Sequence, residues 1–270
     1  MDVVKFGPLV LSVPVLLVLA AFLTANGVAA FHRRRHGSQA DAGPVIWNMM
    51  LFGALASRAV FVLRHHDIYL AKPLSALDIR DGGFDAGAGL IVACVAAALA
   101  TRRHAALRRP AMAAVLAGCA VWFGGTLLAQ LHAPPDAPLP EIAVRRLDGV
   151  EVPLRSYIGK PMVLNLWATW CPPCRREMPV LQAAQRAHPG VAFVFVNQGE
   201  SAETVARFMA QQELRMANVL LDPAARTAAR TGSPGYPATL FYDARGVLRL
   251  RHTGELSEAT LREKLRALEP

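Results

Sequence analysis

The chain has 270 residues, of which 53% are hydrophobic and only 18% are charged, and its mean hydropathy is +0.29. This length suits two domains, but the composition is too apolar for two soluble domains. The net charge of +9 would suit a nucleic-acid-binding protein. However, the basic residues flank apolar runs and do not form a stripe with aromatic residues, so we expect no nucleic-acid partner.

Four apolar stretches precede residue 132, at about 8–31, 44–63, 84–101 and 110–131. Each has close to the roughly 20 residues that are needed to cross a hydrocarbon core of ~30 Å. We therefore predict an all-α domain of about four transmembrane helices over residues 1–131, in contact with the lipid bilayer. The first stretch does not resemble a cleaved signal peptide, because its apolar core is too long, so we expect it to remain as an anchor.

The charges around these stretches predict the orientation of the chain. Basic residues are concentrated in the first and third connections, at 33–35 and 102–109, whereas the second connection, 64–85, mixes basic and acidic residues. By the positive-inside rule, the first and third connections are cytoplasmic. A multi-pass topology follows, in which both termini and the C-terminal domain lie outside the cytoplasm, in an oxidising compartment.

Residues 132–140 contain four prolines and are predicted to form a semi-rigid polyproline linker. The pattern beyond it, in residues 141–270, is that of a mixed α/β domain. Hairpins are predicted for 141–154, around Asp148-Gly149, and for 239–250. Strands are predicted at 162–167 and 191–196. Helices are expected after Cys174, after Ser201, from Asp222 to about Gly232, and after Ser257 with Leu261, Leu265 and Leu268 facing inward.

The segment Trp170-Cys171-Pro172-Pro173-Cys174 lies where the central predicted strand turns into a helix. A spacing of two residues places both sulfurs on one helical face, within reach of a disulfide. Cys171 is expected at the helix N-terminus, where the helix dipole and unpaired N–H groups favour a thiolate. Cys171 is then the attacking thiol and Cys174 the resolving thiol.

Three other interpretations of the cysteine pair are less favourable. A structural zinc site needs four ligands, but the other cysteines, Cys94 and Cys119, lie in apolar runs. A structural disulfide that closes so small a loop would stabilise the chain little. An inert buried pair would not need the prolines. We therefore predict a redox-active Cys171–Cys174 disulfide, without metal or cofactor.

Residues from about 139 to 268 resemble the TlpA/ResA-type thioredoxin-like thiol–disulfide oxidoreductases, which are tethered to the inner membrane of bacteria. The resemblance rests on Gly-Lys-Pro at 159–161, Asn-Leu-Trp-Ala-Thr-Trp-Cys-Pro-Pro-Cys-Arg-Arg-Glu-Met-Pro at 165–179 and Gly-Tyr-Pro-Ala-Thr-Leu-Phe-Tyr-Asp at 235–243. It implies a thioredoxin-like fold for 141–270 and a site that faces the periplasm. The order of the predicted elements agrees with such a fold.

The resemblance also implies roles for residues around the dithiol. Trp170, Pro172 and Pro173 are expected to tune the cysteine pair. Tyr236-Pro237 resembles the family's cis-proline step and is expected to contact substrate. Glu177 matches an acidic residue near the resolving cysteine, although a solvated helix glutamate is an alternative. Asn165 occupies the position where thioredoxin has a buried aspartate, so proton handling would rely on Glu177 or water.

The family resemblance favours a reductant that acts on disulfides of periplasmic proteins and is recharged by a DsbD/CcdA-type membrane reductant. The direction is not fixed by the residues, because about 30 mV of potential corresponds to only ~1.4 kcal/mol. The substrate also stays open among apocytochrome c, which would imply cytochrome c biogenesis, copper-site assembly proteins and oxidised enzymes. A thioredoxin fold that only docks partners is a non-catalytic alternative.

The membrane part is similar to the first half of prolipoprotein diacylglyceryl transferases. The matching segments are Gly-Ala-Leu-Ala-Ser-Arg-Ala-Val-Phe-Val-Leu at 53–63, Lys-Pro-Leu at 72–74 and Asp-Gly-Gly-Phe-Asp-Ala-Gly-Ala-Gly-Leu at 81–90. That family continues into His-Gly-Gly, whereas Asp85-Ala86-Gly87 has no histidine. We interpret the region as a transferase remnant that serves as a membrane base, with lipid transfer as an alternative function. An electron relay through Cys94 and Cys119 is a further alternative.

Overall fold

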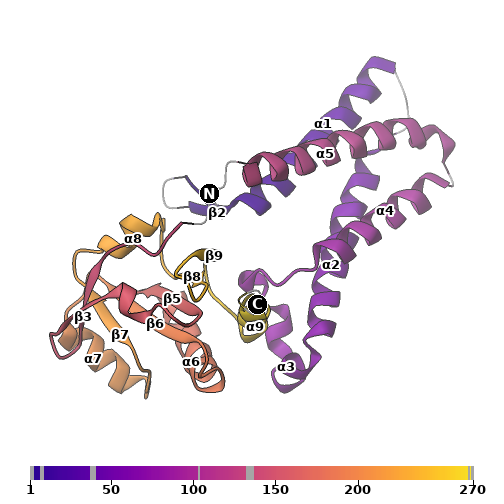
Figure 1. Cartoon of the computed structure of the whole chain (residues 1–270). Helices are drawn as coiled ribbons and strands as arrows, with labels where there is room; N and C mark the ends of the chain where they lie inside the picture. Colours follow the sequence, from indigo (N-terminus) through magenta and orange to yellow (C-terminus); the bar gives the residue numbers. More distant parts are fainter. Residues whose placement is uncertain are drawn as a thin grey trace. The chain divides into compact units, whose positions relative to one another are not determined.

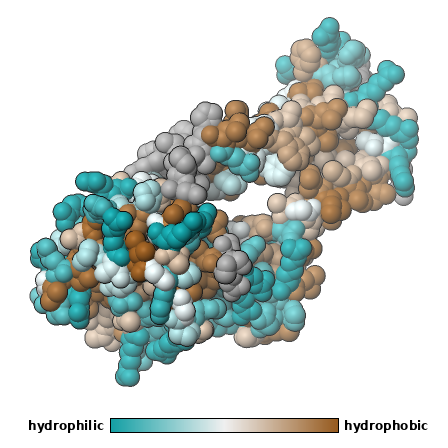
Figure 2. Space-filling view, in the orientation of Figure 1, coloured by the Kyte–Doolittle hydropathy of each residue, from teal (hydrophilic) through white to brown (hydrophobic). Residues whose placement is uncertain are grey.

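The computed structural model describes residues 3–6, 9–36, 41–102, 104–131, 137–266 and 268. The chain divides into two compact units: the first spans Leu11–Ala133, and the second spans Pro134–Pro270 and also includes Asp2–Val10. The first unit is helical and the second is built on a mixed sheet (Figure 1). In Figure 2 the middle of the helical unit is brown and apolar, whereas the surface of the sheet unit is mostly teal and white.

Four long helices dominate the first unit: α1 (Val13–His36), α2 (Gly43–Arg64), α4 (Ala86–Arg102) and α5 (Ala105–Leu131). α1 lies beside α5 and α2 lies beside α4 (Figure 1). Among the described residues, three of the four helices are long and apolar enough to cross a membrane. The exception is α4, which has 17 residues. The predicted count of about four spanning helices is therefore only roughly matched.

The ends of these helices differ from the predicted stretches in two places. Residues predicted to open the first helix form instead the strand β2 (Leu9–Ser12), which pairs with β1 (Val3–Phe6), and α1 begins at Val13. This start places Pro14 in the first helical turn, where a proline is tolerated. α5 begins at Ala105, so most of the predicted third connection is helical. A short helix, α3 (His66–Ala71), and two 3₁₀ helices, η1 (Pro73–Leu77) and η2 (Ile79–Asp81), form the second connection.

The second unit contains a seven-stranded sheet with the order β4-β3-β7-β6-β5-β8-β9. Its strands are β3 (Ala143–Arg146), β4 (Glu151–Pro153), β5 (Met162–Trp167), β6 (Ala192–Gln198), β7 (Val219–Asp222), β8 (Ala238–Tyr242) and β9 (Leu248–Thr253). β5, β6 and β7 are parallel, while β8 runs antiparallel to β5 and β9 antiparallel to β8. The apolar strand 162–167 therefore lies inside the sheet, as its composition predicted.

Helices cover both faces of this sheet. α6 (Pro172–Ala187), α7 (Ala202–Gln211) and α9 (Glu258–Arg266) pack on one face, together with the side chains of Val163 and Trp167 from β5. The 3₁₀ helix η3 (Leu154–Tyr157) and the helix α8 (Arg226–Thr231) pack on the other, together with Leu164 and Leu166. Because side chains alternate along a strand, Asn165 points into the first face, toward α6.

The structure corrects two predictions for this unit. Residues 219–222 form β7, which was not predicted, and α8 begins at Arg226, not after Asp222. In addition, the described part of the predicted linker, 137–140, packs on the sheet unit. The N–H of Leu139 donates to the carbonyl of Gly246, the N–H of Leu248 donates to the carbonyl of Ala137, and Leu139 is buried. The apolar side chain of Leu139 explains this packing. The rest of the predicted linker, residues 132–136, lies outside the described residues.

Candidate active site

The two cysteines lie at the start of α6, directly after the end of β5. Cys171 is the N-cap of α6, and its sulfur accepts a hydrogen bond from the N–H of Cys174 at 3.4 Å. The prolines between them occupy the first helical turn, where no backbone N–H is required for the helix. The two sulfurs are joined in a disulfide. The predicted placement of Cys171 at the helix N-terminus is thus confirmed.

The cysteines differ in accessibility. Cys174 is fully buried and Cys171 is 3% exposed, whereas the preceding Trp170 is 65% exposed. The ring of Trp170 meets the ring of Tyr236 edge to face, with 6.1 Å between their centroids. An aromatic pair, with Trp170 exposed and Tyr236 half-buried, therefore lies next to the dithiol, and Cys171 is slightly more accessible than Cys174.

The Tyr236–Pro237 peptide bond is cis, as predicted. It directly precedes β8, whose first residue, Ala238, pairs with Leu166 near the end of β5. The sheet register therefore brings the proline loop to the same edge as the turn that carries the cysteines. Tyr236 and Trp170, which the sequence separates by more than sixty positions, meet for this reason.

Glu177 is fully buried on the sheet side of α6. Its carboxylate accepts one hydrogen bond from Nδ2 of Asn165 at 2.8 Å and another from the N–H of Leu256 at 3.0 Å. Burial raises the pKa of Glu177 to about 8, although the hydrogen bonds from Leu256 and Asn165 act in the opposite direction. The alternative of a solvated helix glutamate is wrong.

Asn165 connects this carboxyl group to the next strand. Its Nδ2 also donates to Oγ1 of Thr239 on β8 at 3.0 Å, while its Oδ1 has no hydrogen-bond partner among the described residues. The amide nitrogen of Asn165, and not this oxygen, faces the Glu177 carboxyl group. Because burial raises its pKa, the Glu177 carboxyl group can hold a proton one turn after Cys174.

Glu200 is a functional candidate that the sequence analysis did not find. It follows β6, and its carboxylate accepts hydrogen bonds from the N–H of Thr169 and from Nδ2 of Asn197, both at 2.7 Å, and from the hydroxyl of Thr169. Thr169 lies two residues before Cys171, so Glu200 fixes the turn that carries the dithiol. The sequence does contain a signal for Glu200. It follows β6 as Thr169 follows β5, and the carboxyl ends of adjacent parallel strands meet at one edge of a sheet.

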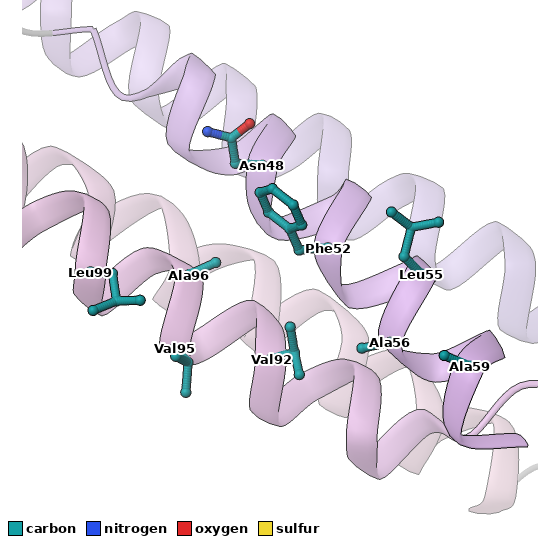
Figure 3. Close-up of a pocket in the computed structure, with 9 residues that line it drawn as sticks. All are labelled: Asn48, Phe52, Leu55, Ala56, Ala59, Val92, Val95, Ala96 and Leu99. Atoms are coloured by element: carbon teal, nitrogen blue, oxygen red, sulfur yellow. The ribbon is translucent and has the colours of Figure 1, made fainter. Parts of the chain in front are cut away.

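The other two cysteines and the buried His65 belong to the helical unit. Cys94 and Cys119 are free thiols on α4 and α5. His65 is buried and its Nδ1 lies 3.1 Å from the carbonyl of Phe61. Across the described residues, no group of histidine, cysteine and acidic side chains could hold a metal ion. An apolar groove of about 550 Å³ lies between α2 and α4, with Asn48 as its polar lining residue (Figure 3).

A mixed sheet that carries a helix-capping dithiol opposite a cis-proline is the arrangement of thioredoxin-like proteins. Residues 135–251 match the AhpC/TSA family. The chain is 31% identical to the thioredoxin-like protein YneN of Bacillus subtilis over 130 residues, which are 47% of this chain and 75% of YneN. It is also 31% identical to the thiol-disulfide oxidoreductase ResA of Halalkalibacterium halodurans over 126 residues, 46% of this chain and 71% of ResA.

A similar solved structure is that of a putative thiol:disulfide interchange protein DsbE from Chlorobium tepidum, with 29% identity and a TM-score of 0.45 over 49% of this chain and 96% of the other. Through its C-terminal half, the chain belongs to the thioredoxin-like thiol-disulfide oxidoreductases. It is an enzyme of thiol–disulfide exchange, and its apolar helices fit a membrane anchor.

Proposed function

We propose that this protein is a dithiol reductant of the bacterial inner membrane whose thioredoxin-like domain faces the periplasm. The observation that carries thiol–disulfide exchange is the N-cap position of Cys171, with the N–H of Cys174 directed at its sulfur, whereas the direction as a reductant rests on the similarity to ResA. A thiolate is stabilised there by the helix N-terminus. Cys171 and Cys174 then exchange two electrons with protein disulfides, without a further cofactor.

The reaction begins with attack of the Cys171 thiolate on a substrate disulfide. One substrate sulfur leaves as a thiolate and a mixed disulfide joins the other to Cys171. Cys174 then loses its proton, for which the buried carboxylate of Glu177 one turn later is the acceptor. The Cys174 thiolate attacks Cys171, the second substrate thiol leaves, and the Cys171–Cys174 disulfide closes. A membrane reductant of the DsbD/CcdA type would restore the dithiol.

Two surfaces suit the recognition of an extended substrate. The ring of Trp170 is an exposed aromatic surface. The Tyr236-Pro237 segment, whose tyrosine ring meets the ring of Trp170 edge to face, provides backbone groups for pairing with a substrate strand. We assign substrate contact to these residues. Pro172 and Pro173 tune the pair by fixing the first turn of α6 around the sulfurs. The substrate is a periplasmic protein with a disulfide, such as an apocytochrome c.

Trapping in cells tests the proposal. Cys174→Ala lacks the resolving thiol and should accumulate mixed disulfides that dithiothreitol releases, while Cys171→Ser should accumulate none. If Cys171→Ser retains full function in cells, the domain acts as a docking module and the redox proposal is wrong. The reduction potential tests the direction: a value below about −200 mV, in the range of thioredoxin, agrees with a reductant, while one near that of DsbA, about −120 mV, indicates an oxidant.

The orientation is supported by the basic ends of the helices. Arg33, Arg34 and Arg35 lie in the last turn of α1, and Arg108 and Arg109 lie in the first turns of α5. With these ends in the cytoplasm, both termini lie in the periplasm. A membrane-impermeant maleimide applied to whole cells should label a cysteine introduced at Ser257 and not one introduced at Arg34; the reverse pattern would invert the topology.

We treat the similarity of the N-terminal region to diacylglyceryl transferases as shared architecture and not as activity. The histidine of that family is absent, and the guanidinium of Arg58 within the similar segment is occupied by five hydrogen bonds to the chain itself. Purified protein should transfer no labelled diacylglycerol from phosphatidylglycerol to a lipoprotein peptide.

A further inference from the structure

α4 is too short to accompany α2 along its whole length. α2 has 22 residues and α4 has 17, so α4 is roughly 25 Å long at about 1.5 Å per residue, less than a hydrocarbon core of about 30 Å. The two helices cross at Gly53 and Gly89, where a Cβ on either residue would lie 3.0 Å from the carbonyl oxygen of the other. This contact fixes the register of the pair.

The register leaves the end of α2 without a helical neighbour from α4. The N–H of Asp85, just before α4, donates to the carbonyl of Ser57, so α4 begins at the level of Ser57. α2 continues to Arg64, which is about 10 Å further along its axis. If α2 crosses a bilayer, the segment that packs beside this last part of α2 lies at the depth of the interfacial layer of the membrane.

That segment is the connection of residues 66–84, which contains α3, η1 and η2 and which we call the collar. It folds around Arg58, which is 9% exposed. The guanidinium donates five hydrogen bonds, to the carbonyl oxygens of Ser75, Ala76, Asp78 and Gly83 and to the carboxylate of Asp81. A Cβ on Gly83 would lie 2.4 Å from the ring of Phe61, so the collar packs directly against α2.

Three ion pairs lie within or beside the collar. Besides Arg58 and Asp81, at 3.0 Å, Arg80 pairs with Asp78 and Arg64 pairs with Asp85, each at 2.6 Å. The polar backbone thus faces a buried cation, and three of the carboxylates are neutralised within the region. This arrangement lowers the cost of placing the segment outside bulk water.

The apolar side chains of the collar point outward. Leu70, Leu74, Leu77 and Ile79 are 77%, 82%, 79% and 62% exposed. Leu74 and Leu77 are three residues apart in η1, so they share one face of the 3₁₀ helix. A connection in water would normally present polar groups to the solvent and bury its leucines. The collar instead exposes these four large apolar side chains along with its polar ones.

We propose that the collar lies in the interfacial layer of the bilayer, with Leu70, Leu74, Leu77 and Ile79 in contact with lipid. The proposal rests on α2 crossing the membrane, with the shorter α4 packed against it inside the bilayer. Lipid is the occupant because the collar lies beside the last 10 Å or so of a spanning helix, and because Leu63 on that same part of α2 is 68% exposed. Irregular backbone is tolerated at this depth where its polar groups are satisfied by protein, and Arg58 satisfies four carbonyls.

Depth-dependent quenching tests the proposal. Full-length protein with Cys94→Ala and Cys119→Ala, and with its Cys171–Cys174 disulfide intact, is given one new cysteine by Leu74→Cys or Leu77→Cys. Each cysteine is labelled with bimane in vesicles of phosphatidylethanolamine and phosphatidylglycerol. Lys72→Cys, an exposed polar position between the apolar ones, is the matched control. We expect doxyl groups near the lipid headgroup to quench bimane at 74 and 77 at least twofold more than at 72, and aqueous iodide to show the reverse order.

Equal access of iodide to positions 72, 74 and 77, without quenching by lipid, would overturn the proposal and leave the leucines available to a protein partner. A protein that retains Cys94 as its single labelled cysteine reports on α4 itself. If bimane at Cys94 is not quenched by the doxyl-labelled lipids, the helices do not lie in the bilayer and the proposal is wrong. Neither result alters the thiol–disulfide chemistry, which the trapping experiment tests separately.

Discussion

The carboxylate of Glu177 lies 2.8 Å from Nδ2 of Asn165, and both side chains are fully buried. Glu177 is on α6 and Asn165 is on β5. The hydrogen bond therefore ties the helix that carries the dithiol to a strand inside the sheet. It also holds the carboxyl group of Glu177 in an environment that favours its neutral form.

This carboxyl group should make the stability of the domain depend on pH. The pKa of Glu177 is about 8 in the folded domain, whereas an unfolded glutamate titrates near about 4.3. The folded state therefore binds the extra proton between these values, and the free energy of unfolding should fall as the pH rises from about 4.3 to 8. The contribution is complete below that window, is lost above it, and is on the order of a few kcal/mol.

Urea unfolding of the oxidised 134–270 domain at pH 5, 7 and 9 measures this effect, because the disulfide-bonded cysteines do not titrate. Glu177→Gln should reduce the decline with pH, since glutamine has no proton to lose. Glu203→Gln is the matched control, because Glu203 is exposed on α7. If Glu177→Gln shows the same pH dependence as the unsubstituted domain, the carboxyl group titrates normally and burial does not raise its pKa.

The two thiols should differ in acidity. We expect the pKa of Cys171 to lie below the usual value of about 8.5, because the helix N-terminus stabilises its thiolate. Cys174 is fully buried, so its pKa should not fall below that value. Alkylation rates against pH for reduced Cys174→Ala and Cys171→Ala report each thiol alone. Equal midpoints near 8.5 would contradict the assigned roles.

Removal of the Glu200 carboxylate should loosen the turn before the dithiol. Glu200→Ala leaves the N–H and hydroxyl of Thr169 without their acceptor. Hydrogen bonds to a charged group contribute about 1.5–3 kcal/mol each, so we expect faster amide exchange at Thr169 and slower reduction of a model disulfide. Glu200→Gln keeps one acceptor oxygen and should be intermediate, while Glu203→Ala should change neither property.

The free thiols of the helical unit should not take part in electron transfer. Cys94 is exposed on α4 and Cys119 is half-buried on α5, and the structure contains no bond between them. Replacement of both by alanine should leave the fraction of reduced Cys171 in cells unchanged, as measured by alkylation and gel shift. A loss of reduced Cys171 in the double variant would support the relay and contradict this expectation.

Short-range patterns were sufficient to predict most of the sheet domain. Ser201 and Ser257 accept hydrogen bonds from the N–H groups of Thr204 and Thr260, as expected of helix caps. The Asp148-Gly149 turn joins β3 to β4 in an antiparallel hairpin. Each of these features is determined by residues that are adjacent or three positions apart, so a single sequence contains the required information.

Features that depend on distant parts of the chain were not predicted. β7 has four residues, too few to show a strand or helix period, and it is a strand because β3 and β6 pair with it. Glu177 is buried because the segment before α9 covers it. This segment supplies the N–H of Leu256, which is 79 positions away from Glu177 in the sequence. Glu200 reaches Thr169 across 31 positions. Each of these contacts exists only after the sheet has formed.

The packing of residues 137–139 against the start of β9 determines how the domain should be excised. β9 is the last strand of its sheet, and Pro138 forms an antiparallel bridge with Val247 just ahead of it. A fragment that began at residue 141 would leave the carbonyl of Gly246 and the N–H of Leu248 unpaired and would remove the buried Leu139. An uncovered strand edge beside an apolar surface is a template for intermolecular pairing. Such a fragment should aggregate on concentration, whereas one that begins at residue 134 should stay monomeric.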